Sequence, residues 1–245
     1  MSRVAVVTGG ASGIGLGVAR SFAADGYRGA ILDYREAAAA AAELTDGGAT
    51  AVAVDVDVAD RASVEAGFAR VRAELGPVEI LVTSAGIESF TPVLDITGER
   101  WDQIIGVNLT GTFTCIQAAL ADMIPAGWGR IVTISSSSAQ SGAPDMAHYV
   151  ASKGGVIALT KALAVELARG GITVNTIPPS LVDTPMVHQA EAAGDFPGLA
   201  VVGPMVPLGR AGTPADIAAA CSFLCSEGGD YITGQVIGVN GGMYI

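Results

Sequence analysis

The sequence predicts an α/β protein built on a doubly wound, mostly parallel sheet of seven strands, with helices on both faces. Two observations predict this fold class. Short apolar runs alternate with longer helix-like runs along the chain, and this alternation is typical of a parallel sheet. The short runs are rich in valine and isoleucine without a polar residue at every second position, as in strands that are buried on both faces.

The first half of the chain alternates strand and helix regularly. Residues 3–8 form the first apolar run, and a helix is expected directly after the glycines that follow it. The run of alanines at residues 35–44 favours a second helix. In order, this half contains expected strands at residues 3–8, 29–33, 50–56 and 79–83, and expected helices at residues 14–25, 35–44 and 61–75.

The second half continues the alternation and departs from it once. Its expected strands are residues 129–135, 172–177 and 235–239, and its expected helices are residues 98–123, 147–169 and 213–224. Residues 178–210 break the pattern with six prolines and several glycines. A loop this long inside a compact domain is usually functional, so we expect a substrate lid at about residues 183–212. No linker or repeat divides the chain, and a single catalytic domain over residues 1–245 is expected.

The composition indicates a globular protein and disfavours several kinds of partner. Half of the residues are hydrophobic and 15% are charged, which fits a packed core. The net charge of −11 disfavours binding to nucleic acid or to an anionic membrane surface. No apolar stretch reaches the roughly 18 residues of a membrane span, and the first residues do not resemble a signal peptide. A cytoplasmic protein is therefore expected.

The three cysteines do not predict a disulfide framework or a metal site. Cys115, Cys221 and Cys225 are an odd and sparse set. The spacing of Cys221 and Cys225 could place two metal ligands on one helix face, but no histidine or further cysteine lies near them in the sequence. We therefore expect buried thiols and no metal.

A glycine-rich turn follows the first strand and opens the first helix. Residues 8–15 read Thr-Gly-Gly-Ala-Ser-Gly-Ile-Gly, in which Gly9, Gly13 and Gly15 are informative. Glycine permits the positive φ of a tight turn, and its missing side chain lets the backbone approach a pyrophosphate. The N-terminus of the helix offers free N–H groups to the same anion. The segment therefore predicts a dinucleotide-binding domain of the Rossmann type.

An acidic residue at the end of the second strand predicts which dinucleotide binds. The carboxylate of Asp33 is placed to accept hydrogen bonds from the hydroxyls of the adenosine ribose. The same charge repels the 2′-phosphate of NADP, and no arginine occupies position Ser12 or Tyr34, where it could bind that phosphate. Arg35 is the nearest cation and lies further along the chain. NAD is therefore the expected cofactor.

Three side chains in the second half suggest proton transfer. Tyr149 and Lys153 are four residues apart at the start of an expected helix, so they share one face. A nearby ammonium favours the phenolate and would bring the pKa of tyrosine, ordinarily about 10, toward neutral pH. Ser136 lies just past the fifth strand, at the end of the sheet where ligands bind. The four serines at residues 135–138 leave the assignment among them open.

These segments together resemble the short-chain dehydrogenase/reductase family, in its single-domain branch, over essentially the whole chain. The resemblance rests on several motifs in the family's order, which are far more specific than any one of them. They are TGGASGIG at residues 8–15, Asp57-Val58, SAG at residues 84–86, Asn108 in VNLTG, GRIVTISS at residues 129–136, YVASK at residues 149–153 and ITGQ at residues 232–235.

The resemblance implies roles for particular residues. Tyr149 would be the general acid/base, and Lys153 would lower its pKa and bind the nicotinamide ribose. Ser136, rather than its neighbours, would bind the substrate oxygen, and Asn108 would support a water chain that relays the proton from Lys153. The expected cofactor-binding residues are Gly9, Ser12, Gly13, Ile14, Gly15, Asp33, Tyr34, Asp57, Val58, Ser84, Ala85, Gly86, Tyr149, Lys153, Pro179, Val182 and Thr184. The expected substrate residues are Ser138, Met146, Met186 and Phe196.

Two departures from the family pattern lie beside the expected site. The usual Asn-Asn-Ala-Gly after the fourth strand is Thr-Ser-Ala-Gly here, at residues 83–86. The usual Pro-Gly after the sixth strand is Pro179-Ser180, preceded by a further proline at position 178. Neither departure removes a proton-transfer group.

The expected function is NAD(H)-dependent interconversion of a secondary alcohol and a ketone, on an apolar, cyclic or hydroxyacyl small molecule. The alternative within the family is a 3-oxoacyl-thioester reductase, and scattered arginines do not decide between the two. Alternatives of other classes are a non-catalytic dinucleotide-binding protein and a methyltransferase, neither of which needs the serine, tyrosine and lysine together. The resemblance also implies a homotetramer built on the long helices around residues 100–122 and 149–169. Small residues there would equally suit packing inside one subunit.

Overall fold

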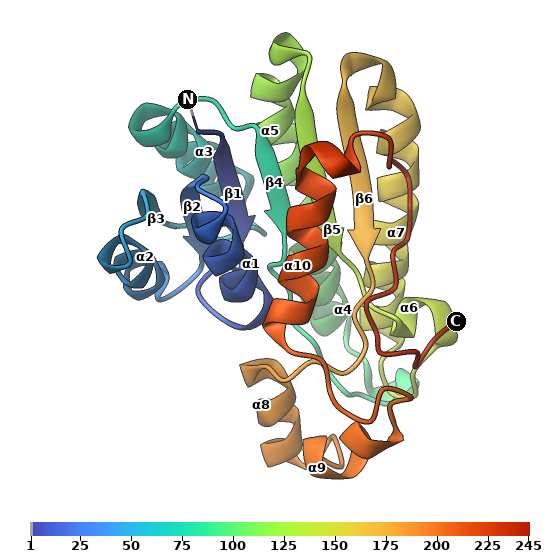
Figure 1. Ribbon diagram of the computed structural model, residues 1–245. Helices are drawn as coiled ribbons and strands as arrows, with labels where there is room; N and C mark the ends of the chain where they lie inside the picture. The colour runs from blue at the N-terminus through green and yellow to red at the C-terminus, as the bar shows by residue number, and fades with distance from the viewer. Residues whose placement is uncertain (1) are drawn as a thin grey trace.

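One parallel sheet forms the centre of the computed structural model, which describes residues 2–245 (Figure 1). Its strands are β1 (Val4–Thr8), β2 (Arg28–Asp33), β3 (Ala51–Asp55), β4 (Ile80–Thr83), β5 (Gly129–Ile134) and β6 (Ile172–Ile177). The strand order is β3-β2-β1-β4-β5-β6, and every neighbouring pair is parallel. The doubly wound α/β prediction is confirmed, with six strands in place of seven.

The expected seventh strand, residues 235–239, does not form as a strand. It meets β6 at one bridge, where the N–H of Thr176 donates to the carbonyl of Gln235 (3.0 Å) and the N–H of Ile237 donates to the carbonyl of Thr176 (2.9 Å). The N–H of Gln235 donates instead to the side chain of Asn175 (3.0 Å). The side chain of Asn175 thus takes the N–H that would have paired with the carbonyl of Val174, and Pro178, the next residue on the β6 side, has no N–H to continue the pairing. The segment therefore only follows the edge of β6.

Alternate residues of each central strand face opposite helical layers. The layers are formed by α1 (Gly13–Ala24), α2 (Ala37–Asp46), α3 (Arg61–Leu75), α5 (Thr112–Ala126), α7 (Ala147–Leu167) and α10 (Pro214–Cys225). On β1, Val4 and Val6 belong to the core under α3, α5 and α7, whereas Ala5 and Val7 belong to the core under α1, α2 and α10. In Figure 1, α1 and α10 cover the face of the sheet nearer the viewer. Burial on both faces explains the unbroken apolar runs of the strands.

The long helix expected at residues 98–123 contains a wider turn. It comprises α4 (Gly98–Ile105), a π-helical turn (Gly106–Gly111) and α5. Within Gly98–Ala126, a window of 18 residues has a mean hydropathy of 1.5, so this stretch is long and apolar enough to cross a membrane by those two measures. It packs instead against β4, β5 and α3, as expected of a core helix.

The chain changes direction between β1 and β4, and this point organises the site. β1, β2 and β3 are added toward one edge of the sheet, and α3 then carries the chain back to β4 on the other side of β1. In such sheets the ligand site lies beyond the carboxyl ends of the strands at this reversal. In Figure 1, α8 (Pro185–Ala193) and α9 (Leu199–Val202) lie beyond those ends.

The two ends of the expected lid are held together where the segment leaves the domain and returns to it. Val182 and Gly212 form an isolated parallel bridge, in which the N–H of Gly212 donates to the carbonyl of Leu181 (2.9 Å) and the N–H of Asp183 donates to the carbonyl of Gly212 (2.9 Å). The segment between them contains α8 and α9, so it is more helical than the proline count suggested. α6 (Ser138–Ser141) lies at the same end of the molecule (Figure 1).

Candidate active site

A cavity of about 960 Å³ opens at the carboxyl ends of the strands, between the glycine-rich turn, the loops after β3, β4 and β5, and the lid. Most of the residues predicted from the sequence lie in its wall. They are Gly9, Ser12, Gly13, Ile14, Asp33, Tyr34, Asp57, Val58, Ser84, Ala85, Gly86, Ser136, Ser138, Met146, Tyr149, Lys153, Pro179, Val182, Thr184, Met186 and Phe196. Gly15 and Asn108 do not line the cavity themselves, but each of them contacts a residue that does.

The glycine-rich turn leaves no room for side chains. Gly9 has a φ of +63°, and a Cβ there would lie 2.7 Å from the backbone of Ala85. A Cβ on Gly15 would lie 2.0 Å from the carbonyl oxygen of Gly9. The side chain of Ser12, the N-cap of α1, makes no capping hydrogen bond. The first N–H groups of α1 are therefore available to an anion, and the turn fits a dinucleotide pyrophosphate.

Asp33 ends β2 beside this turn. One carboxylate oxygen accepts from the N–H of Ala11 (3.0 Å) and the other from the N–H of Arg35 (3.2 Å). The guanidinium of Arg35 lies over the ring of Tyr34, 5.3 Å from its centre. Asp33 thus stabilises the turn and also lines the cavity, where its remaining lone pairs can accept hydrogen bonds from ribose hydroxyls.

Lys153 is buried on α7, and its ammonium donates to the carbonyl oxygen of Ile134 at the end of β5 (2.9 Å). Its nitrogen lies 5.8 Å from the centre of the Tyr149 ring. Burial lowers the pKa of Lys153 to about 8, and the negative charge of Glu88 opposes this shift. The lysine is therefore charged at neutral pH, but its pKa is much closer to 7 than the pKa of an exposed lysine.

The phenol of Tyr149 differs from the expectation that Lys153 lowers its pKa. Removal from water, together with the negative charge of Glu88, raises the pKa of Tyr149 to about 12. A hydrogen bond with Ser136 acts in the opposite direction. Burial and the carboxylate outweigh this hydrogen bond, so the phenol is held protonated. This is the form that donates a proton.

Ser136 is oriented by its own loop. Its hydroxyl lies 2.8 Å from the hydroxyl of Ser138 and accepts from the N–H of Ser138 (3.2 Å). Ser135, by contrast, is buried and bonds to the carbonyl of Ile177 (3.3 Å). Among these serines, Ser136 and Ser138 therefore form a bonded pair in the cavity wall, and Ser136 is the one that interacts with Tyr149.

Asn108 has a clear structural task in the π-helical turn. Its amide oxygen accepts from the N–H of Ile87 (2.9 Å), and its amide nitrogen donates to the carbonyl of Ile87 (3.0 Å) and to the hydroxyl of Ser152 (3.0 Å). A Cβ on Gly86 would lie 3.3 Å from both the Asn108 oxygen and the Lys153 nitrogen. The side chain of Asn108 therefore fixes the loop after β4 against α7. The water relay implied for it stays a prediction.

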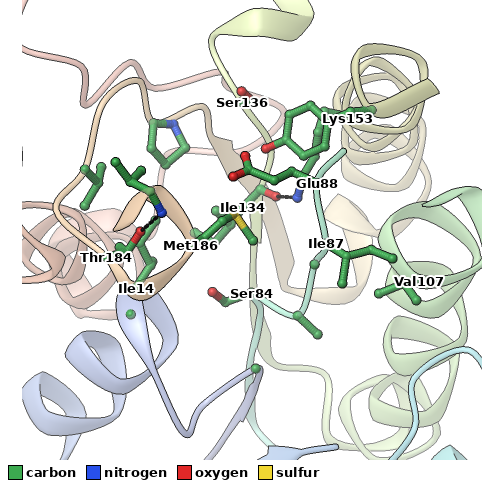
Figure 2. Close-up of a pocket in the computed structure, with 18 of the residues that line it drawn as sticks. Ile14, Ser84, Ile87, Glu88, Val107, Ile134, Ser136, Lys153, Thr184 and Met186 are labelled. Carbon is green, nitrogen blue, oxygen red and sulfur yellow. Dashed lines mark hydrogen bonds between the residues drawn. The ribbon is translucent and has the colours of Figure 1, made fainter. Parts of the chain in front are cut away.

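Glu88 is a cavity residue that no sequence motif predicted. It follows the Ser-Ala-Gly segment by two positions and lines the cavity with Ser136, Tyr149 and Lys153. Figure 2 shows its side chain extending past Lys153 toward the open cavity. Partial burial and the charge of Asp195 raise the pKa of Glu88 to about 7, and Lys153 acts against this shift. The available signal was its place in the loop after a central strand, where ligands bind.

The two departures from the family pattern are accommodated locally. Ser84 lines the cavity, and its N–H donates to the carbonyl of Thr8 (3.2 Å). The hydroxyl of Thr83, where the family pattern has an asparagine, is buried and finds no hydrogen-bond partner among residues 2–245. The carbonyl of Pro179 accepts from the N–H of Ser137 (2.9 Å), which joins the loops after β5 and β6.

The lid touches the dinucleotide turn directly. The hydroxyl of Thr184 caps α8 by accepting from the N–H of Val187 (3.5 Å). A Cβ on Gly13 would lie 3.4 Å from the methyl group of Thr184. A dinucleotide at the turn would therefore also meet the start of the lid. Met186 and Phe196 line the cavity. Residues 2–245 contain no cluster of three or more His, Cys, Asp or Glu side chains that could hold a metal ion.

Comparison with known proteins relates this geometry to a family of enzymes. A family model described as enoyl-(acyl carrier protein) reductase matches residues 9–244. The chain is 41% identical over 244 residues to an acetoacetyl-CoA reductase of Rhizobium meliloti, covering 100% of this chain and 99% of that protein. It is 38% identical over 249 residues to the 3-oxoacyl-[acyl-carrier-protein] reductase FabG of Staphylococcus aureus, with coverages of 100% and 99%. The solved structure of gox2181 superposes with a TM-score of 0.92 at 33% identity, covering 98% of this chain and 95% of that chain.

Proposed function

The chain belongs to the short-chain dehydrogenase/reductase family, and from this premise we propose that it interconverts a ketone and a secondary alcohol by hydride transfer with NAD(H). The observation that supports the proposal best is the convergence of Ser136, Tyr149 and Lys153 in one cavity with the glycine-rich turn. A non-catalytic dinucleotide-binding protein would not need the three side chains together. The same argument disfavours a methyltransferase.

The names of the relatives favour one class of substrate, a 3-oxoacyl thioester, over a simple alcohol. One is named for acetoacetyl-CoA and the other for 3-oxoacyl groups on acyl carrier protein. A 3-oxoacyl thioester is therefore the first ketone to test. The apolar part of the cavity, with Met146, Met186 and Phe196, is compatible with a short acyl chain.

The side chains define the proton transfer in the reductive direction. Bound NADH supplies the hydride. Ser136 donates a hydrogen bond to the substrate's carbonyl oxygen, and Tyr149 donates its proton to that oxygen as the negative charge develops. The ammonium of Lys153 stabilises the phenolate that remains on Tyr149. Oxidation of the alcohol is the reverse, with the phenolate accepting the proton.

The choice of NAD over NADP rests on Asp33. Its carboxylate lines the cavity at the end of β2, where it would meet the adenosine ribose, and it would repel a 2′-phosphate. Arg35, which could oppose this effect, lies over the ring of Tyr34. We expect kcat/KM with NADH to exceed that with NADPH by at least about tenfold.

The proposal includes a homotetramer, which the exposed apolar side of the long helix α7 supports. Ala151, Ala158, Ala162 and Val165 lie exposed along one side of it, with Val165 83% exposed. Gly155, by contrast, packs inside the subunit, because a Cβ there would lie 2.7 Å from a side chain of the π-helical turn. Small residues of this helix therefore serve both internal packing and an apolar outer face.

The first test is consumption of NADH or NADPH with acetoacetyl-CoA, with and without the substitution Asp33→Ser. Turnover with a preference for NADH that Asp33→Ser weakens would support both the reaction and the role of Asp33. Equal efficiency with the two cofactors would contradict the cofactor proposal alone. No turnover of any ketone, despite measurable NADH binding, would contradict the proposed reaction.

A further inference from the structure

The carboxylate of Glu88 faces the cavity without a partner of its own. Among residues 2–245, no hydrogen bond or ion pair to its side chain is formed, and only its backbone carbonyl accepts a hydrogen bond. It shares the cavity wall with Ser136, Tyr149 and Lys153, the groups that surround the reacting oxygen in the proposed function (Figure 2). A partly buried carboxylate without a partner is costly, unless a ligand provides one.

The side chains of Asn108 and Arg100 hold the backbone around Glu88 with three hydrogen bonds. Asn108 bonds both the N–H and the carbonyl of Ile87, at 2.9 and 3.0 Å. A guanidinium nitrogen of Arg100 donates to the carbonyl of Glu88 (3.0 Å), and its other terminal nitrogen donates to Gln103 (2.6 Å). These bonds fix the backbone from which the Glu88 side chain leaves the loop, as expected of a loop that positions a group to contact substrate.

The charges around Glu88 leave both of its protonation states accessible near neutral pH. The ammonium of Lys153 favours the carboxylate, whereas partial burial and Asp195 in the lid favour the acid and place its pKa at about 7. The carboxylate only accepts hydrogen bonds, and the acid can also donate one. A hydroxyl group can both donate and accept, so it matches either state. A carbonyl oxygen, such as that of a thioester, matches only the acid.

We propose that Glu88 binds a hydroxyl group on the carbon next to the reacting carbonyl, so that the preferred substrate is a hydroxy ketone, or the matching diol in oxidation. This inference rests on the proposed reduction of a ketone, and it names a hydroxy ketone as the preferred ketone in place of the 3-oxoacyl thioester that the relatives' names favour. The adjacent carbon is specified because Glu88 lies beside the side chains that surround the reacting oxygen. Glu88 would then distinguish this chain's substrate from the thioesters for which its relatives are named.

The test compares two ketones that differ in one group. Acetoin carries a hydroxyl on the carbon next to the carbonyl, and methyl isopropyl ketone carries a methyl in the same place. The kcat/KM for each is measured with NADH for the wild type, Glu88→Leu, Glu88→Gln and the matched control Glu99→Gln, in which an exposed glutamate of α4 loses its charge. Acetoacetyl-CoA is the third substrate, and NADH binding by fluorescence checks that each variant is folded.

We expect Glu88→Leu to reduce the preference for acetoin over methyl isopropyl ketone by at least about tenfold, the loss falling on acetoin. Glu88→Gln should keep part of the preference, because an amide also donates and accepts. Glu99→Gln should keep all of it. An unchanged preference in Glu88→Leu, or a wild type that favours acetoacetyl-CoA over acetoin, would overturn the inference and leave the proposed reaction intact. A wild type that reduces no ketone would instead overturn the proposed reaction itself.

Discussion

At the scale of single residues, the protein shifts the pKa values of two neighbouring side chains of the site, Tyr149 and Lys153, in opposite directions. Burial raises the pKa of Tyr149 to about 12 and lowers the pKa of Lys153 to about 8. The phenol is thereby kept as the acid, while the lysine nearby holds its proton only moderately. Glu88 modifies both, because its negative charge raises the pKa of each group.

Substituting Tyr149→Phe tests the assigned proton donor. The ring and its packing are kept, and only the hydroxyl is lost, so NADH binding should remain. A positioned general acid typically contributes about 100-fold or more, and we expect kcat to fall by at least that factor. Steady-state turnover and NADH fluorescence measure the two effects separately. A variant with wild-type kcat would show that another group protonates the substrate.

The pH dependence of ketone reduction should follow Lys153. Tyr149 stays protonated over the neutral range, so it does not limit the reaction there. Lys153 loses its charge as the pH rises through about 8, and kcat should fall over the same interval. In Glu88→Gln the fall should move to lower pH, because the charge that raises the pKa of Lys153 is removed. Superimposable pH profiles of the two proteins would contradict this electrostatic coupling.

Spacing and the family resemblance were enough to locate Ser136, Tyr149 and Lys153, and the structure brings them together. The environment of each side chain could not be predicted in the same way. The pKa of Tyr149 depends on how many neighbours exclude water and on Glu88, which comes from a loop far away in sequence. Glu88 itself matches no motif, and its importance follows from a position in space.

At the scale of elements, the glycine-rich turn is determined by contacts between backbones. Position 15 has no space for a side chain, because a Cβ there would lie 2.0 Å from the carbonyl oxygen of Gly9. Gly29 in β2 is a matched control, since a Cβ there would meet no atom within 4 Å. The two positions therefore separate the need for glycine in the turn from a general effect of added bulk.

Gly15→Ala should lower the free energy of unfolding by at least about 2 kcal/mol and should weaken NADH binding, because the backbone of the turn must move. Gly29→Ala should change the unfolding free energy by less than about 1 kcal/mol. Urea unfolding followed by circular dichroism, together with NADH titration, measures both quantities. Equal stability of the two variants would mean that the turn adapts without cost.

Elements with a strong local pattern were predicted well. The six strands and the main helices follow from apolar runs that are buried on both faces of the sheet. Residues 235–239 have the composition of a strand, yet Asn175 takes a backbone bond that the ladder would need. The lid helices were missed because α8 and α9 are short and lie among prolines.

At the scale of the whole molecule, the exposed apolar side of α7 predicts association. Four small or branched apolar side chains are exposed to water there, and a second copy of the helix could cover them closely. Size-exclusion chromatography with light scattering should give the mass of a tetramer. Ala158→Glu should shift the protein to smaller species, whereas Ala126→Glu, at the exposed end of α5, should not. A wild-type monomer would contradict the prediction.

The packing of α1 against α10 has a consequence for synthesis of the chain. The two helices are neighbours in space, although Gly13–Ala24 leaves the ribosome early and Pro214–Cys225 leaves it near the end. β1 must likewise wait for β4 before it is paired on both sides. The side of α1 that packs against α10 therefore stays uncovered during most of translation, while exposed apolar surface can lead to aggregation. This topology favours folding of the full-length chain over stepwise folding of its first half.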